Sequence, residues 1–198
     1  MGAEVYKSCC RGCKISQGIE ELTGGIIELD GNWILNHYSS EEGFLGWMAL
    51  QPRFHRMELK DLTADETRAL GGNIQNIDIA LRQYWAIRFR DDLIQRVYLV
   101  YFFESTGYHL HIHLVPRTKK FYELEAEGCS VLKEKKDCPL LFAPLNKYKF
   151  IAWNICRINK HKKFPQRYQT KKGNKKSEKE VEALMTYLRG YLWKLPAR

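Results

Sequence analysis

Three of the six histidines in this 198-residue chain stand at alternate positions, as His109, His111 and His113. Apolar residues separate them, and Pro116 follows shortly after. Because side chains alternate between the two faces of a β-strand, this spacing predicts a strand that presents all three imidazoles on one face. Such a row of rings can ligate a metal ion, attack phosphorus as a nucleophile or bind phosphate oxygens. A half-exposed strand with a histidine-rich face is the alternative without chemistry.

The segment from His109 to Val115 resembles the signature of the histidine triad (HIT) family, in which three histidines alternate with apolar residues. The Pro116-Arg117 pair that follows is similar to the fragile-histidine-triad branch of that family. The family comprises nucleotide hydrolases and transferases that act on phosphorus next to a nucleoside. Over about residues 9–117, the resemblance therefore implies an α+β fold, with an antiparallel sheet and flanking helices, and a homodimer.

A second group of candidate ligands begins at the N-terminus, where Cys10 and Cys13 have C-x-x-C spacing. Two thiolates at this spacing can reach one tetrahedral zinc, although a redox-active or idle pair is equally compatible with it. In zinc-containing HIT proteins, such a pair binds zinc together with the histidine of a Pro-x-x-His segment and the first triad histidine. The resemblance thus implies a closed, structural zinc site of Cys10, Cys13, His55 and His109. Free thiols and a surface His55 are the alternative.

The resemblance also implies roles for residues around the triad. His111 is the expected nucleophile, which attacks the α-phosphorus and forms a nucleotidyl-histidine intermediate that water resolves. His113 is expected to bind phosphate oxygens and to stabilise charge as the leaving group departs. Ser105 and Thr106, in the turn before the triad, would assist catalysis and bind the nucleotide, unless they form an ordinary turn. Asn36 would contact the nucleoside, or would simply end its strand.

Trp47 is the one marked departure from the family pattern. It follows Gly46 in a segment that resembles the family's Gly-His-apolar strand, at the position where most members have a histidine that handles phosphate. An indole can stack or donate one hydrogen bond, but it carries no positive charge. We therefore assign Trp47 to the nucleotide site and expect a changed substrate preference or a low turnover.

Hydrophobic periodicity and turn residues predict the elements that position these side chains. Asp30-Gly31-Asn32 is a strong hairpin signal, and Thr63 with Glu66 forms a capping box at the start of a helix. His37, for which the sequence offers no partner, is expected to be exposed. The predicted strands are 26–29, 33–36, 43–52 and 96–103, and the predicted helix is 63–81.

The positive charge of the chain lies in its C-terminal third. Residues 133–198 contain 18 Lys and Arg against 5 Asp and Glu, whereas residues 1–132 contain 14 against 18, which together give the net charge of +9. We expect a HIT-like catalytic domain over 1–118 and an extension over 119–198, with a basic linker at 157–176 that either is solvated or contacts nucleic acid. The extension ends in an amphipathic helix that packs on the domain or on a partner. Its apolar stripe comprises Val181, Leu184, Met185, Leu188, Leu192 and Leu195.

The remaining composition narrows the class of protein. No apolar run approaches the ~20 residues of a membrane span, no signal peptide is evident, and six irregularly spaced cysteines favour a reducing cytoplasm. A P-loop motif is absent from the sequence. The leading hypothesis is a nucleotide hydrolase or transferase that releases AMP from dinucleoside polyphosphates or adenylated conjugates. The alternatives are a deadenylase of nucleic-acid ends, suggested by the basic linker, and a nucleotide-binding protein with little turnover, suggested by Trp47.

Overall fold

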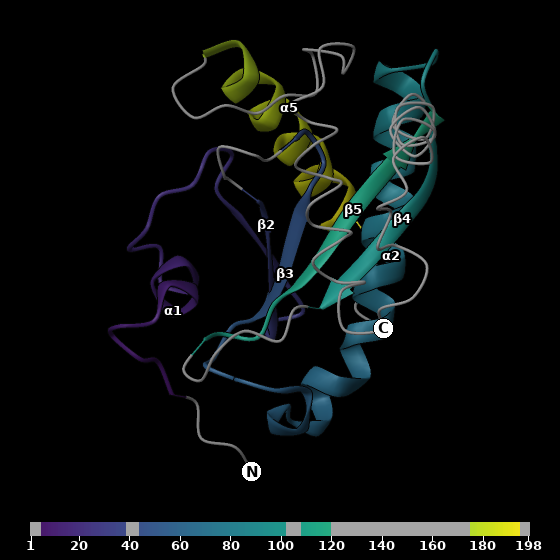
Figure 1. The fold of residues 1–198 in the computed structure, drawn as a ribbon. Helices are drawn as coiled ribbons and strands as arrows, with labels where there is room; N and C mark the ends of the chain where they lie inside the picture. The colour runs from purple at the N-terminus through teal and green to yellow at the C-terminus, as the bar shows by residue number, and fades with distance from the viewer. Residues whose placement is uncertain (1–4, 39–43, 102–107, 120–174, 195–198) are drawn as a thin grey trace, which may run out of the picture.

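The computed structural model describes residues 5–38, 44–101, 108–119 and 175–194 (Figure 1). Within them, five strands form one antiparallel sheet in the order β1-β2-β3-β5-β4. The α+β architecture predicted from the sequence is therefore confirmed. The strands are β1 (Ile26–Leu29), β2 (Trp33–His37), β3 (Met48–Pro52), β4 (Ile94–Tyr101) and β5 (Ile112–Thr118), and the helices are α1 (Arg11–Ser16), the 3-10 turn η1 (Leu59–Asp61), α2 (Ala64–Arg88) and α5 (Lys175–Leu192).

The turn between β1 and β2 confirms the predicted hairpin. Asp30 and Gly31 both have positive φ angles, of 49° and 75°, and the Asn32 amide donates to the Leu29 carbonyl over 3.2 Å. Two consecutive residues with positive φ are typical of the turns whose twist matches that of paired strands. Aspartate and glycine adopt this conformation at low cost, which explains why the signal was readable from sequence.

Strand β3 is shorter than predicted and begins at Met48. Gly46, two residues earlier, has a φ of +87°, which interrupts the extended backbone. A Cβ atom at this position would lie 2.7 Å from the Trp85 ring and 2.9 Å from Pro116. The absence of a side chain at Gly46 therefore allows the chain to turn into β3 in close contact with helix α2 and strand β5.

Helix α2 begins with the predicted capping box. The Thr63 hydroxyl accepts the Glu66 amide over 3.2 Å, and the Glu66 carboxylate accepts the Thr63 amide over 2.7 Å. Each bond satisfies a backbone N–H at or before the first turn of the helix. The helix runs for 25 residues and buries one face, including Ile77, Leu81 and Trp85, against the sheet.

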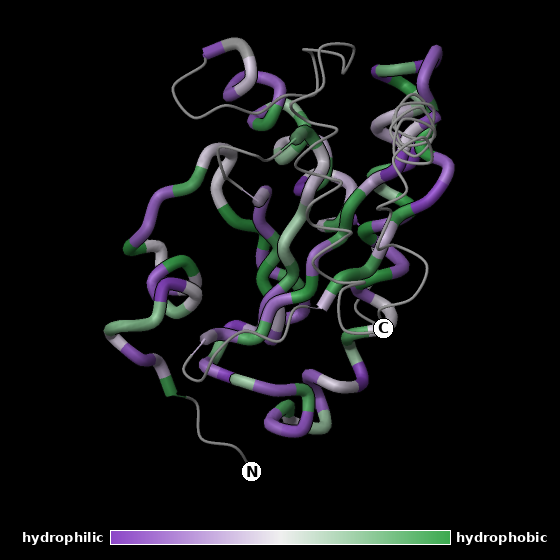
Figure 2. The backbone as a smooth tube through the Cα atoms, in the orientation of Figure 1, coloured by the Kyte–Doolittle hydropathy of each residue, from purple (hydrophilic) through white to green (hydrophobic). Residues whose placement is uncertain are grey.

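Helix α5 packs on the domain, beside α2 and the β1 end of the sheet (Figure 1). Figure 2 shows hydrophobic and hydrophilic residues interspersed along it, as expected of an amphipathic helix. Its buried stripe joins the main core and consists of Val181, Leu184, Met185 and Leu188. Glu180 pairs with Arg88 of α2 over 2.8 Å, and Arg189 donates to the carbonyls of Gly24 and Ile26. Leu192 is partly buried.

Parts of the predicted extension lie outside the described residues, including Leu195 and most of the basic linker. The domain boundary at residue 118 stays a prediction. None of the helices in the described part of the chain is long and apolar enough to span a membrane.

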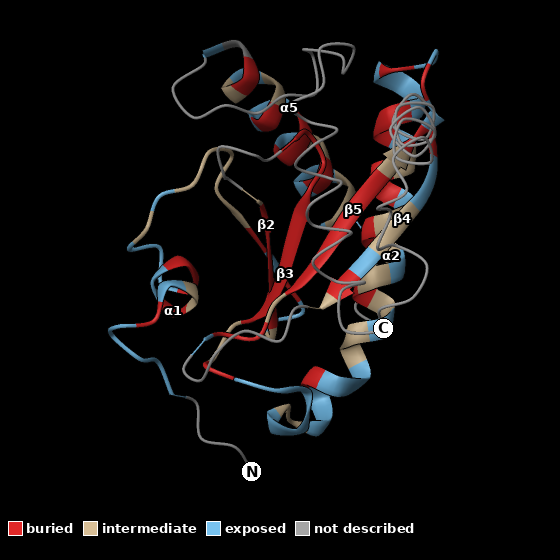
Figure 3. Cartoon of the chain, viewed as in Figure 1, coloured by how far each residue is buried: buried red, intermediate tan, exposed pale blue. Residues whose placement is uncertain are grey.

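The strand that carries the triad begins later than the alternation of the histidines predicts. Strand β5 starts at Ile112, because the preceding Leu110 donates its amide to the Arg56 carbonyl, 2.7 Å away in the segment after β3. The strand continues through Pro116 to Thr118. Strand β3 pairs with β5 only as far as Leu114, so among the described strands only β4 pairs with β5 at Pro116. Figure 3 shows β3 and β5 as largely buried and β4 as partly exposed.

Candidate active site and metal centre

Four side chains from separate parts of the chain converge beside the sheet. Cys10 and Cys13 lie at the start of α1, His55 follows β3, and His109 precedes β5. One ligand atom from each residue lies within 4.8 Å of the others. The Cys10 sulfur is 3.6 Å from His109 Nδ1, and the Cys13 sulfur is 3.4 Å from His55 Nδ1. The structure thus brings together the four residues predicted as metal ligands.

The surroundings of this cluster fit a zinc ion. His109 Nε2 lies 2.8 Å from the Pro52 carbonyl, which can only accept, so the proton is on Nε2 and the Nδ1 lone pair faces the sulfur atoms. A carbonyl behind a ligating imidazole is the usual arrangement in metal sites. The Lys7 amide also donates to the Cys13 sulfur over 3.3 Å. Two sulfurs and two imidazole nitrogens are a typical structural zinc set.

Protons have to leave this cluster when a cation enters it. Burial raises the pKa of the Cys13 thiol to about 11, and burial lowers the pKa of His109 to about 4. The neutral imidazole is already in its ligating form, whereas the thiol is not. Zinc binding would therefore release protons from the cysteines, and its apparent affinity would rise with pH.

One glutamine binds helix α1 to the sheet, and one glycine allows the helix to approach His109 closely. Gln51 of β3 donates its amide to the Gly12 carbonyl over 2.9 Å and to the Ser16 hydroxyl over 3.0 Å. A Cβ atom on Gly12 would lie 2.5 Å from the His109 side chain. Both residues thus bring the cysteines of α1 close to His109.

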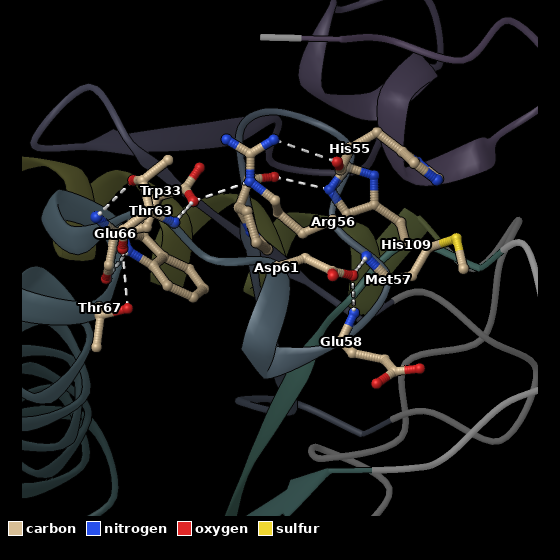
Figure 4. A network of polar contacts seen from close by, with 11 residues as sticks. Trp33, His55, Arg56, Met57, Glu58, Asp61, Thr63, Glu66, Thr67 and His109 are labelled. Atoms are coloured by element: carbon tan, nitrogen blue, oxygen red, sulfur yellow. Dashed lines mark hydrogen bonds and ion pairs between the residues drawn. The ribbon is translucent and has the colours of Figure 1, made fainter. Parts of the chain in front are cut away.

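A buried ion pair connects the metal cluster to helix α2 (Figure 4). Arg56 Nε lies 2.9 Å from Glu66 Oε2, and the two side chains are 4% and 2% exposed. The Arg56 guanidinium also donates to the His55 carbonyl over 3.3 Å. The sequence indicated Glu66 as a capping residue but gave no signal for its pairing with Arg56.

The three triad histidines divide between two sites. His109 faces the cysteines, whereas His111 and His113 lie together with their ring centroids 4.8 Å apart and their planes nearly perpendicular. His111 Nδ1 is 2.9 Å from the His109 carbonyl. Because a carbonyl cannot donate, His111 Nδ1 carries the proton of the neutral ring and Nε2 is its unprotonated nitrogen. His111 is half-buried and His113 is buried.

Trp47 is in direct contact with His113. Its indole N–H donates to His113 Nδ1 over 3.0 Å, and the ring of Tyr38 packs on both, at centroid distances of 4.6 Å and 4.9 Å. Burial lowers the pKa of His113 to about 3, with a smaller contribution from His111. The sequence singled out Trp47 as a departure from the family, but its partner became evident only in the fold. Direct contact of Trp47 with a nucleotide stays a prediction.

Asn36 lies on the same face of the sheet as His113. It pairs with Ala49 of β3, which pairs in turn with His113 of β5, and residues paired across antiparallel strands share a face. Two strand spacings separate Asn36 from His113 by roughly 10 Å. The Asn36 amide donates to the His37 carbonyl, while its buried Oδ1 has no partner among the described residues.

The prediction that His37 is exposed was wrong. Its side chain is only 1% exposed. Its Nε2 accepts the Gly46 amide over 3.2 Å, a contact that depends on the turn before β3 and is not visible in the sequence. Ser105 and Thr106 lie outside the described residues, so their roles stay predictions.

No protein-family model matches the sequence, and no curated protein is similar to it. The fold is similar to a zinc-bound histidine triad family protein from Mycobacterium smegmatis, with 14% identity, coverage of 92% of this chain and 96% of the other, and a TM-score of 0.47. A HIT family protein from Bacillus anthracis is 16% identical over 62% of this chain and 96% of its own, with a TM-score of 0.44. A HIT family hydrolase from Legionella pneumophila is 22% identical over 54% and 90%, with a TM-score of 0.36. Because these sequence identities and TM-scores are low, the function of the chain is inferred from the geometry of its site.

Proposed function

We propose that the chain is a HIT-type nucleotide hydrolase or transferase that cleaves AMP-containing substrates at the α-phosphorus, with His111 as the nucleophile. One observation carries this proposal. His111 Nδ1 donates to the His109 carbonyl over 2.9 Å, which makes Nε2 the unprotonated, nucleophilic nitrogen of a ring that is only half-buried. The His-x-His-x-His motif supports the same conclusion independently, through its resemblance to the family.

The reaction follows from the state of that ring. The Nε2 electron pair of His111 forms a bond to the α-phosphorus, and the bond from phosphorus to the leaving group breaks with its electron pair on the leaving group. Water then adds to phosphorus, the N–P electron pair returns to Nε2, and AMP is released. Overall, one water molecule is consumed for each substrate molecule that is cleaved. A different acceptor in place of water makes the same step a transfer.

The neighbouring residues support a nucleotide bound along the sheet. His113, beside His111, would donate to phosphate oxygens and stabilise charge in the transition state. Asn36 shares its face of the sheet, at a separation of roughly 10 Å given by two strand spacings. This distance suits a nucleoside whose α-phosphate lies at the histidines, with Ser105 and Thr106 as further phosphate ligands.

A zinc ion completes the proposal as a structural element. Cys10, Cys13, His55 and His109 would hold it, and a fourfold protein-ligated zinc leaves no position for substrate. Bound there, zinc would fix the backbone of His109, whose carbonyl orients His111. These four residues would thus use the ion to support the position of the nucleophile, outside the reaction itself.

The test is AMP release from diadenosine tri- and tetraphosphate, an AMP-amine conjugate and an adenylated oligonucleotide. The wild type is compared with His111→Ala and with a control variant, Leu99→Ala, at a half-exposed position on β4. Zinc content and circular dichroism establish that each variant is folded. Release that is lost in His111→Ala and retained in Leu99→Ala supports the proposal.

Two other results would point elsewhere. Release that persists in His111→Ala would contradict the proposed nucleophile. Tight AMP binding without release by the zinc-loaded wild type would favour a nucleotide-binding protein, and a marked preference for the oligonucleotide would favour a deadenylase.

A further inference from the structure

We propose that Trp47 is a positioning residue that holds His113 as its Nε2–H tautomer, and that the site therefore acts on phosphoanhydrides in preference to phosphoramidates. The first part rests on contacts within the described residues alone. The second part rests on the proposed function and names its substrate class more narrowly.

The tautomer follows from the chemistry of the two groups. An indole N–H can only donate, and that of Trp47 is 3.0 Å from His113 Nδ1. His113 Nδ1 must therefore accept, so a neutral His113 carries its single proton on Nε2. The opposite tautomer and the imidazolium both place a proton on Nδ1, where it would face the indole proton. A histidine at position 47 would impose no such choice, because its ring can either donate or accept.

Packing holds this bond in place. Trp47 and His113 are 4% and 3% exposed, and Tyr38 covers both rings. Backbone hydrogen bonds fix Trp47 on both sides, since its carbonyl accepts the Tyr38 amide over 2.7 Å and its amide donates to the Phe44 carbonyl over 3.0 Å. The low pKa of His113, which burial causes chiefly, is consistent with a neutral ring.

A His113 ring that is held neutral affects oxygen and nitrogen leaving groups differently. In a phosphoanhydride, the P–O bond breaks and the departing oxygen takes the electron pair as a phosphate anion, which is stable without a proton. In a phosphoramidate, the P–N bond breaks and the departing nitrogen must receive a proton, because an amide anion is too basic to leave. Imidazolium is a good donor of that proton, whereas a neutral imidazole held at Nε2–H supplies a hydrogen bond only. The wild-type site therefore stabilises an acidic leaving group but does not protonate a basic one.

Nitrogen-15 NMR of the histidine rings tests the tautomer without any substrate. The protonated and unprotonated nitrogens of a neutral imidazole have well-separated shifts, and the His113 signals are assigned by their loss in His113→Gln. We expect the zinc-loaded wild type at about pH 7 to show the proton on Nε2 and none on Nδ1. A proton on Nδ1 in the wild type overturns the proposal, whether or not any variant folds.

Two substitutions each remove one buried indole hydrogen bond. Their comparison separates the specific effect of Trp47 on His113 from a general loosening of the core. Trp47→Phe removes the donor to His113, whereas the control Trp33→Phe removes a 2.9 Å bond from the Trp33 indole to the Glu66 carbonyl. Both indoles are buried. Only Trp47→Phe is expected to change the His113 nitrogen shifts. Equal changes in both variants, or no change in either, would contradict the assigned role.

The substrate preference is tested with Trp47→His. The readout is the ratio of kcat/KM for diadenosine triphosphate to that for an AMP-amine conjugate. Because a positioned general acid contributes about 100-fold or more, the substitution should lower this ratio by about that factor. An unchanged ratio, with the expected tautomer in the wild type, overturns the substrate class. If His111→Ala also retains activity, the proposed function fails while the tautomer result still stands.

Discussion

The buried pair between Arg56 and Glu66 allows a sharp prediction for the substitution Glu66→Gln. The change keeps the size and the shape of the side chain, and its amide oxygen can still accept the Thr63 amide. It removes the negative charge that lies 2.9 Å from the Arg56 guanidinium. Arg56 then loses the carboxylate with which it forms this buried ion pair (Figure 4).

The burial of the pair sets the size of the effect. With side chains 4% and 2% exposed, solvent cannot compensate the uncovered charge, and removing one partner of such a pair costs about 3–5 kcal/mol. This is a large fraction of the roughly 5–15 kcal/mol by which a domain is stable. At an m-value of about 2–3 kcal/mol per molar urea, the unfolding midpoint should fall by about 1–2 M.

Urea unfolding of the zinc-loaded protein measures this loss directly, and helix α2 supplies a matched control. Asp65, the neighbour of Glu66 in the sequence, pairs with Arg68 at the surface, where the side chains are 69% and 76% exposed. Asp65→Asn should cost less than about 1 kcal/mol. If Glu66→Gln is no more destabilising than Asp65→Asn, the reasoning from burial is refuted.

Three further perturbations test other parts of the structure. Burial lowers the pKa of His37 from 6.5 to about 4, so the folded state favours the neutral ring, and stability present above pH 6.5 should fall by about 3 kcal/mol toward pH 4. In His37→Gln, whose amide oxygen can still accept the Gly46 amide, the free energy of unfolding measured with urea should lack this fall toward pH 4. A fall equal to that of the wild type would contradict the burial of a neutral His37. Gly12→Ala should weaken zinc binding in a chelator competition by about ten-fold or more, because its Cβ would lie 2.5 Å from His109; an unchanged affinity would argue against close contact of α1. Leu184→Ala should lower the free energy of unfolding by about 2–5 kcal/mol, since this α5 side chain is fully buried in the core, and a negligible loss would mean that α5 does not pack there in solution.

Local signals in the sequence predicted the parts of the fold that depend on neighbouring residues. The turn at Asp30 and Gly31 and the capping box of Thr63 and Glu66 are both present, because each depends on conformational preferences within three or four residues. The alternation of the triad placed His113 on a strand, but it did not predict that β5 starts only at Ile112. That boundary is set by contacts with the segment after β3.

The functional residues divide in the same way. Cys10, Cys13, His55 and His109 were predicted as one cluster through resemblance to a family, and the structure brings them together. His37 and Arg56, by contrast, interact with Gly46 and Glu66, which lie nine and ten residues further along the chain. The bond from Trp47 to His113 spans 66 residues, and no periodicity indicates it. Long-range polar pairs of this kind require the fold itself.

The proposed function requires that His111 becomes covalently attached to the nucleotide during turnover. Rapid acid-free quenching of the zinc-loaded protein during turnover of diadenosine triphosphate, followed by mass spectrometry of its peptides, tests this most directly. We expect one added adenylyl group on the peptide that contains His111, attached at the ring nitrogen that does not face the His109 carbonyl, and no adduct in His111→Ala. Rapid turnover with an adduct on another residue, or with the same adduct in His111→Ala, would contradict it.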